Sequence, residues 1–488
     1  MSRALADIRV ALQRAGLLTG ESGALPQSVA ALTDDSRGVS PGALFLAVRG
    51  AERDGHAFLA VAAERGAIAA IVDDPSRTTL PALVVSDTRR AAAVAAAAFH
   101  GEPAAQLRLI GVTGTNGKTT TVGMLRHLLD EPAARAASIG TLGVLVGGAG
   151  EPLDGGSGLT TPGPVELQRV LRVLHDEGVR TIAMETSSHA LHQRRVEGLT
   201  FVAGVFTNLT RDHLDYHGTM EAYFAAKAAL VGQLAGDGVA VVNADDRAWD
   251  SLPPAPRTVR FGLGAAADVR VRHVRSTPDG SRFVLVLGGD TRDVMLPVIG
   301  DFNVANALAA AATAWVLGVD ADTIAARIAT MPQVPGRLEM VNDRPTVLRD
   351  YAHTPDSLER AIAAVRPFTT GRLIVVFGCG GDRGRGKRPE MGRIAARGAD
   401  VAIVTSDNPR TEDPERILDD IEAGMQDVPH ERIEDRRDAI ARALDLAAAD
   451  DVVLLAGKGH ETYQVRGTTR LPFDERQIVH EIVTERVS

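Results

Sequence analysis

Cysteine is almost missing from this chain, because Cys379 is the only one among 488 residues. A single cysteine excludes an internal disulfide and any metal site built from several cysteines, and it fits a reducing compartment. We therefore expect a cytoplasmic protein in which Cys379 is a small buried residue.

Long apolar runs are also missing, and no stretch reaches the length that spans a bilayer. Residues 1–18 are amphipathic, with charged side chains spread through them, and lack the continuous apolar core of a secretion signal. We therefore expect no membrane insertion.

The chain also lacks an excess of positive charge. It has 53 Lys and Arg residues and 62 Asp and Glu residues, which gives a net charge of −9. This balance argues against a general binder of nucleic acid or anionic membranes. It leaves room for an anionic small substrate, because local basic loops can work inside an acidic protein. The hydrophobic content of 45% is ordinary for a globular protein, and the length suggests about three domains.

The most informative stretch that is present is residues 111–120, Gly-Val-Thr-Gly-Thr-Asn-Gly-Lys-Thr-Thr. It lies between a predicted strand, 107–110, and a helical pattern, 122–129, which is the layout of a phosphate-binding loop. Val112 stands where the standard loop has glycine, so the match is to a compact form. A glycine-rich turn that only reverses the chain is the alternative. The residues predicted to bind ATP here are Gly114, Thr115, Asn116, Gly117, Lys118, Thr119 and Thr120.

Alternating strands and helices predict an α/β protein of three domains, 1–105, 106–335 and 336–488. In the first, we expect strands at 43–48 and 69–72 and helices at 57–64 and 88–99. In the second, a parallel sheet is expected from strands at 110–113, 181–184, 202–207 and 238–243, with a more antiparallel insert at 269–286 that turns at Pro278. In the third, the strands 373–377, 401–405 and 452–455 each lead into a polar loop, where ligands of open α/β sheets bind.

Two buried strands of the central domain end in polar residues. Glu185 follows the strand 181–184, and residues 207–218 after the next strand contain two histidines and several carboxylates. A carboxylate beside a phosphate loop is where a nucleotide enzyme needs a Mg²⁺ ligand. Alone, Glu185 could equally cap a helix or form a salt bridge.

The order of these motifs, Gly-Thr-Asn-Gly-Lys-Thr, Glu-x-Ser-Ser-His and Asn-Leu-x-x-Asp-His-Leu-Asp-x-His-Gly, resembles the Mur ligase family over nearly the whole chain. Members use ATP and Mg²⁺ to join amino acids to the peptide of a cell-wall precursor. The resemblance implies a uridine-nucleotide domain, a central ATPase domain and a Rossmann-like C-terminal domain. It also implies that Lys118 acts on the phosphates, that Thr119 and Glu185 hold one Mg²⁺, and that His213 and a carbamylated Lys227 hold a second.

Other matched positions extend the implied sites. Asn303, Arg337 and Asp350 match residues that face ATP. Ser36, Thr160, Thr161, Ser187, Gln193 and Arg195 match residues that hold the uridine-linked muramoyl dipeptide. Without the surrounding match, Arg195 would be interpreted as a solvated charge and Asp350 as a structural residue.

The loop Asp407, Asn408, Pro409 and Arg410 resembles the version of the family that adds meso-diaminopimelate. Diaminopimelate carries a carboxylate that lysine lacks, and a guanidinium can pair with it. Arg383, Gly457 and Glu461 match the rest of that pocket. The resemblance thus implies an acyl-phosphate ligase of peptidoglycan precursor synthesis, and hence of cell-wall formation, cell shape and division, that acts as a monomer. The rivals are a lysine-adding sister ligase, a folylpolyglutamate synthase-like ligase and a nucleotide-driven regulatory switch.

Overall fold

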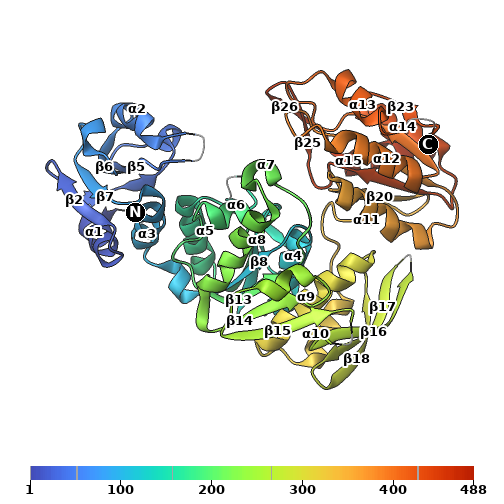
Figure 1. The fold of residues 1–488 in the computed structure, drawn as a ribbon, viewed down its shortest axis with the longest axis horizontal. Coiled ribbons are helices and arrows are strands. Elements are labelled where there is room, and N and C mark those ends of the chain that lie inside the picture. The colour runs from blue at the N-terminus through green and yellow to red at the C-terminus, as the bar shows by residue number, and fades with distance from the viewer. Residues whose placement is uncertain are drawn as a thin grey trace. The chain divides into compact units, whose positions relative to one another are not determined.

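A computed structural model describes residues 2–50, 53–155, 158–264, 266–277, 279–425 and 428–487 (Figure 1). The chain falls into two compact units, Met1–Arg260 and Phe261–Ser488. The expected turn residue Pro278 lies outside the described residues. None of the helices in the described ranges combines the length and the apolarity that crossing a membrane requires.

The first unit begins with a five-stranded sheet whose two faces are both covered by helices (Figure 1). Alternate residues of its strands pack on α1 (Leu5–Arg14) and α3 (Thr88–His100), while the others pack on α2 (Leu59–Glu64). The predicted strands and helices are found here with ends shifted by a few residues. The strand order is β2 (Leu18–Ser22), β7 (Ala82–Val85), β6 (Ala67–Val72), β5 (Ala43–Leu46) and β4 (Ala31–Thr33).

The rest of the first unit is built on a mostly parallel sheet, as the alternating pattern predicted. Its parallel strands, in spatial order, are β9 (Arg135–Gly140), β12 (Val179–Glu185), β8 (Arg108–Thr113), β13 (Phe201–Phe206) and β14 (Leu234–Asn243). An antiparallel hairpin of β10 (Gly143–Val146) and β11 (Glu151–Leu153), which the sequence pattern did not reveal, continues the sheet beyond β9.

The register of this sheet explains where its polar residues gather. Glu185 pairs with Val112, and Phe206 pairs with Thr113, so β12, β8 and β13 end at one edge. Helix α4 (Lys118–Leu129) starts at that edge and packs on β9 and β12. The short helices α6 (Ser188–His192), α7 (Leu214–His217) and α8 (Met220–Ala228) follow the other two strand ends.

The second unit opens with the antiparallel insert that the sequence predicted. Its strands are β16 (Val269–Thr277), β17 (Gly280–Leu287) and β18 (Asp290–Leu296). Helix α9 (Asp301–Val316) contacts β16 and β17, and α10 (Ala321–Ala329) contacts β18. The alanine-rich face of α9 is buried, which lets this helix approach the sheet closely.

The second unit ends in a doubly wound α/β domain. Its strands lie in the order β19 (Glu339–Asn342), β20 (Thr346–Asp350), β24 (Val452–Ala456), β21 (Leu373–Phe377), β22 (Val401–Val404) and β23 (Glu431–Arg432). All neighbours are parallel except β19 and β20. Every strand residue of β21 is buried, since one face packs on α11–α13 (Pro355–Val365, Lys387–Gly398, Pro414–Glu422) and the other on α14 and α15 (Arg436–Leu446, Glu475–Val487).

Candidate active site

The phosphate-binding loop is held in shape by the residues that follow β13. The Asn208 side chain accepts from the Asn116 backbone N–H at 2.9 Å and donates to the Asn116 carbonyl at 3.1 Å. Thr207 Oγ1 also donates to that carbonyl, at 2.7 Å. A Cβ atom at Gly114 would lie 1.9 Å from Thr207 Oγ1, so only glycine fits there. The loop is therefore an ordered structure clamped from the neighbouring strand, and not a simple chain reversal.

Two lysines converge on this loop. Lys118 Nζ donates to the carbonyl of Gly114 at 2.9 Å and to that of Thr115 at 2.8 Å, and Lys227 Nζ donates to the Gly114 carbonyl at 2.6 Å. Lys227 is 1% exposed and lies over the Tyr223 ring. Burial, reinforced by the charge of Lys118, lowers the pKa of Lys227 well below its usual value. The uncharged, nucleophilic form of this amine is therefore more favoured than it is in an exposed lysine.

Glu185 links the loop helix to the strand ends. Its Oε1 accepts from Thr119 Oγ1 at 3.0 Å and from the Thr141 N–H at 2.7 Å, and the side chain is buried. Octahedral Mg²⁺ holds oxygens at 2.0–2.1 Å, which places adjacent ligands about 2.9 Å apart, so this oxygen pair fits the ion. The described residues contain no group of three or more His, Cys, Asp or Glu placed to hold a metal. Phosphate and water would have to complete such a site.

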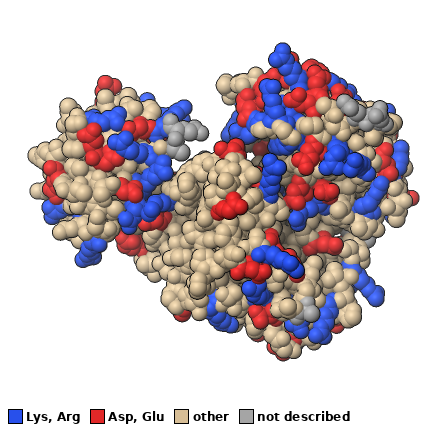
Figure 2. Space-filling model, in the orientation of Figure 1, with Lys and Arg blue, Asp and Glu red and all other residues tan. Residues whose placement is uncertain are grey.

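Histidines and tyrosines form the wall beside the two lysines. The ring of His189 lies 4.2 Å from that of Tyr216 and 4.8 Å from that of His213, measured between centroids. Burial lowers the pKa of His213, and it lowers the pKa of His189 to about 4, so these rings are neutral near pH 7. A neutral imidazole is the form that binds a metal ion. On the face that Figure 2 shows, the surface over α6–α8 is mostly uncharged.

Five of the six residues predicted to hold the dipeptide lie in one hydrogen-bonded chain. Thr161 Oγ1 donates to the Glu185 carbonyl at 2.8 Å and receives the Ser187 N–H at 3.1 Å. The Arg195 guanidinium donates to the Thr161 carbonyl at 3.0 Å and to Gln193 Oε1 at 2.7 Å. Thr160 Oγ1 lies 3.3 Å from Thr141 Oγ1. These residues are therefore connected, through Thr161, to the predicted magnesium ligand Glu185.

Tyr216 supports this chain of hydrogen bonds, although the sequence patterns did not single it out. Its hydroxyl lies 3.1 Å from Gln193 Nε2 and 2.9 Å from His192 Nδ1. We expect Tyr216→Phe to release Gln193 and to raise the KM for the dipeptide substrate about fivefold, the cost of one hydrogen bond of about 1 kcal/mol. Steady-state kinetics with the dipeptide and ATP varied in turn checks this, with the KM for ATP as the internal control. An unchanged dipeptide KM would contradict it.

Ser36, the sixth predicted dipeptide residue, lies in a 3₁₀ turn (Ser36–Gly38) capped by Asp35, and Arg65 donates to its carbonyl at 3.3 Å.

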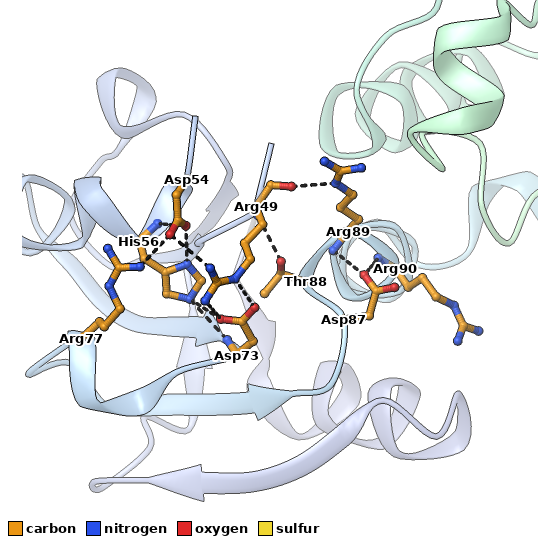
Figure 3. A network of polar contacts seen from close by, with 9 residues as sticks. All are labelled: Arg49, Asp54, His56, Asp73, Arg77, Asp87, Thr88, Arg89 and Arg90. Carbon is orange, nitrogen blue, oxygen red and sulfur yellow. Dashed lines mark hydrogen bonds and ion pairs between the residues drawn. The ribbon is translucent and has the colours of Figure 1, made fainter. Parts of the chain in front are cut away.

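Nearby in the chain, a fully buried His56 ring bridges two carboxylates (Figure 3). Its Nδ1 lies 2.7 Å from Asp54 Oδ1, and its Nε2 lies 3.0 Å from Asp73 Oδ1. The network fixes the loop after β5, so we assign His56 a structural role.

The ATP-facing residues predicted in the second unit differ in exposure. Asn303 is fully buried, and its amide bonds the Ile299 carbonyl and Asn306 inside the start of α9. Arg337 lies over the Tyr351 ring at 4.8 Å. Asp350 Oδ2 accepts from the Leu338 N–H at 2.7 Å, and burial raises its pKa to about 6. The roles of all three toward ATP stay predictions.

The loops at the carboxyl ends of β21, β22 and β24 meet, as the rule for open sheets predicted. Arg410, at φ +52°, donates from its side chain to the Gly381 carbonyl at 2.8 Å. The approach is so close that a Cβ at Gly381 would lie 1.9 Å from the Pro409 carbonyl oxygen. Arg383 on the same loop is exposed. The Gly457 N–H donates to the Asp350 carbonyl at 2.9 Å.

Buried polar atoms gather where these loops meet. Asp407 is 7% exposed, and its Oδ2 lacks a hydrogen-bond partner within the described part of the chain. The Asn408 amide donates to Glu461 Oε2 at 2.8 Å.

Cys379 is buried beside Met391, and burial raises the pKa of its thiol to about 12, so it is the inert small residue that was expected.

Comparisons with known proteins identify the family of this chain. Three family models match: the Mur ligase family catalytic domain at residues 28–101, the Mur ligase middle domain at 112–314, and the Mur ligase glutamate ligase domain at 336–459. A protein of Geobacillus thermodenitrificans (strain NG80-2), named UDP-N-acetylmuramoyl-L-alanyl-D-glutamate–2,6-diaminopimelate ligase, is 45% identical over 94% of this chain and 95% of its own.

Two solved structures extend the comparison. One, titled as the structure of a UDP-N-acetylmuramoyl-L-alanyl-D-glutamate–2,6-diaminopimelate ligase, is 33% identical, covers 100% of both chains and has a TM-score of 0.69. The folylpolyglutamate synthase of Mycobacterium tuberculosis, complexed with ADP and AMPPCP, is 20% identical over 76% of this chain and 92% of its own, with a TM-score of 0.64, and shares the fold alone. The chain therefore belongs to the Mur ligase family.

Proposed function

We propose that this protein is an ATP-dependent ligase that adds meso-diaminopimelate to UDP-N-acetylmuramoyl-L-alanyl-D-glutamate. The observation that carries the proposal is the 45% identity, over nearly the full length, to a relative named for that reaction. The clamped phosphate loop and the Asp407–Arg410 loop agree with it chemically. The folylpolyglutamate synthase covers less of the chain at lower identity, so that rival is not favoured.

The reaction runs in two steps that this chain's residues can support. The carboxylate of the D-glutamate side chain attacks the γ-phosphorus of ATP, which releases ADP and leaves an acyl phosphate. Lys118 lies at the loop where charge gathers on the phosphate oxygens. The neutral amine of the incoming amino acid then attacks the acyl carbon and forms the C–N bond, the C–O bond to phosphate breaks, and the nitrogen loses a proton as phosphate leaves. Positioning and exclusion of water are the main tasks of the protein.

Magnesium is part of the proposal. Thr119 and Glu185 would hold one ion, and His213 with a carbamylated Lys227 would hold another. The ions would neutralise the developing phosphate charge. The lowered pKa of Lys227 supports the modification, because a neutral amine adds to CO₂ and loses a proton to form a carbamate, which replaces a buried amine by an anionic oxygen ligand.

The remaining assignments follow the same reasoning. We propose three domains, at residues 1–105, 106–335 and 336–488, with the last one delivering the amino acid. We place the protein in the cytoplasm as a monomer that takes part in cell-wall formation and so in cell shape and division. Its partners are the uridine-linked dipeptide and the diamino acid.

Arg410→Ala tests the choice of amino acid. The guanidinium would pair with the carboxylate that distinguishes diaminopimelate from lysine, a charge-assisted bond worth about 1.5–3 kcal/mol. We therefore expect kcat/KM for meso-diaminopimelate to fall by roughly 10- to 150-fold while the KM for ATP stays constant. The measurement is ADP release with the dipeptide and a panel of diamino acids.

Arg385→Ala is the matched control, because Arg385 lies near the same loop but is exposed and bonded to Glu412. An equal loss with lysine and with diaminopimelate would refute the pocket assignment. ADP release that depends on no amino acid would refute the ligase itself.

A further inference from the structure

Lysine is rare in this chain, which has only four among its 53 basic residues. Lys118 and Lys227 belong to the phosphate loop, and Lys387 donates to the His353 carbonyl at 2.7 Å. The fourth, Lys458, follows β24 and has no exposed side-chain surface. A buried ammonium is costly to remove from water unless its partners compensate, so its contacts reveal its purpose.

Lys458 binds the two residues at the centre of the amino-acid pocket. Its Nζ donates to Asn408 Oδ1 at 3.0 Å and to Glu461 Oε2 at 3.1 Å. The rings of Tyr463 and Phe473 lie 5.8 Å and 6.0 Å from Nζ and form an aromatic wall around it. An apolar side chain of the same length would fit such a wall, so packing alone does not require a lysine.

The contacts of Lys458 fix the amide of Asn408 in one orientation. Asn408 Oδ1 faces two donors, Lys458 Nζ and the Val465 backbone N–H at 2.9 Å. A flipped amide would turn its own N–H groups against both donors. The Nδ2 group must therefore point the other way, where it donates to Glu461 Oε2 at 2.8 Å.

The same contacts use only one of the two carboxylate oxygens of Glu461. Lys458 and Asn408 both donate to Oε2, while the side chain as a whole keeps 14% of its surface exposed. Oε1 is therefore the oxygen that an incoming ammonium can take. Because the pocket loops are joined backbone to backbone, with the Arg410 N–H on the Val465 carbonyl at 3.0 Å, the arrangement is held on both sides.

We infer that Lys458 is a positioning residue for amino-acid recognition, which acts by orienting Asn408 and Glu461 toward the ammonium and carboxylate groups of the incoming amino acid. This inference rests on the proposed function. It assigns the selectivity of the pocket partly to a side chain that never touches the substrate.

The experiment compares Lys458→Met with the unmodified protein in ADP release. We expect the KM for meso-diaminopimelate to rise about tenfold or more, the scale of a lost charge-assisted contact, while the constants for ATP and dipeptide change less than about twofold. Asp451→Asn is the matched control, because Asp451 is buried and accepts the Arg372 N–H at 2.6 Å at the opposite end of β24. It should lower thermal stability without changing the diaminopimelate KM.

A partial reaction shows whether the variant is folded. Hydroxylamine can replace the amino acid and capture the acyl phosphate as a hydroxamate, with release of phosphate, and this needs no amino-acid pocket. Lys458→Met should keep hydroxylamine-dependent ADP release. Loss of both activities in equal measure would mean a merely structural lysine and would overturn the inference.

A double-mutant cycle tests the route of the effect. If Lys458 acts through Glu461, then adding Lys458→Met to Glu461→Gln should cost little more than Glu461→Gln alone. Independent, multiplying losses would overturn the inference. If the unmodified protein is active with diaminopimelate but Lys458→Met leaves the KM unchanged, the inference about Lys458 is overturned and the proposed function stands. An unmodified protein inactive with every diamino acid would overturn both.

Discussion

Replacing Lys227 with methionine lowers the rate of ligation by about 100- to 1,000-fold, the scale seen when one preorganised electrostatic group is removed from an active site. The same change makes the fold harder to unfold. Lys227 has a pKa well below that of an unfolded lysine, so the unfolded chain binds more protons at any pH between the two pKa values. The resulting cost in stability is absent above the pKa of an unfolded lysine and grows as the pH falls toward the folded value. Methionine removes that cost.

Three measurements check this expectation. Amino-acid-dependent ADP release gives the activity, thermal unfolding in CO₂-free buffer gives the stability, and the ¹³C spectrum after labelled bicarbonate shows whether a carbamate forms. Lys387→Met is the matched control, since Lys387 is the lysine that bonds the His353 carbonyl far along the chain from the phosphate loop. A carbamate signal that persists in Lys227→Met, or a variant that is less stable than the parent, would contradict the argument.

The strand ends could be predicted from sequence because local patterns determine them. The strand 181–184 is apolar and is followed by Glu185, and parallel strands end at one edge, so Glu185 had to lie near the phosphate loop. Thr119 and Glu185 do lie within a hydrogen bond of each other. The roles of these residues toward magnesium and ATP remain predictions, because the geometry alone does not test them.

The supporting residues could not be predicted because their contacts join distant parts of the chain. Asn208 clamps a loop 92 residues earlier, and Lys458 holds an asparagine 50 residues before it. A lone asparagine or lysine in a polar loop has no periodic pattern to mark it. The β10–β11 hairpin was missed for a different reason, since its strands have only four and three residues and are too short to show an alternating pattern.

Truncating Arg436 to alanine should lower the free energy of unfolding of the C-terminal unit by about 3–5 kcal/mol. Arg436 and Glu475 are both fully buried and lie 2.8 Å apart, between α14 and α15. The guanidinium also donates to the Ala456 carbonyl at 2.9 Å, at the end of β24. Removing it leaves a buried carboxylate without its counter-ion, in a place that water reaches poorly.

Denaturant unfolding followed by far-UV circular dichroism measures this loss. The double variant Arg436→Met with Glu475→Leu is the control, because replacing both partners by apolar groups removes the unpaired charge and should recover most of the stability. If the double variant is as unstable as the single one, the damage comes from lost packing and not from the carboxylate. As a comparison, breaking the exposed ion pair Arg360–Asp356 on α11 should lower the free energy of unfolding by less than about 1 kcal/mol.

The close approach of Gly381 to the Pro409 carbonyl limits how this enzyme can be redesigned. The backbones of the two loops are already in contact, so a smaller amino acid cannot be accommodated by shifting one loop toward the other. Altered preference must come from exchanging side chains that project into the space, with Arg410 as the first choice. Libraries aimed at new cell-wall peptides should therefore randomise those side chains and leave the glycine untouched.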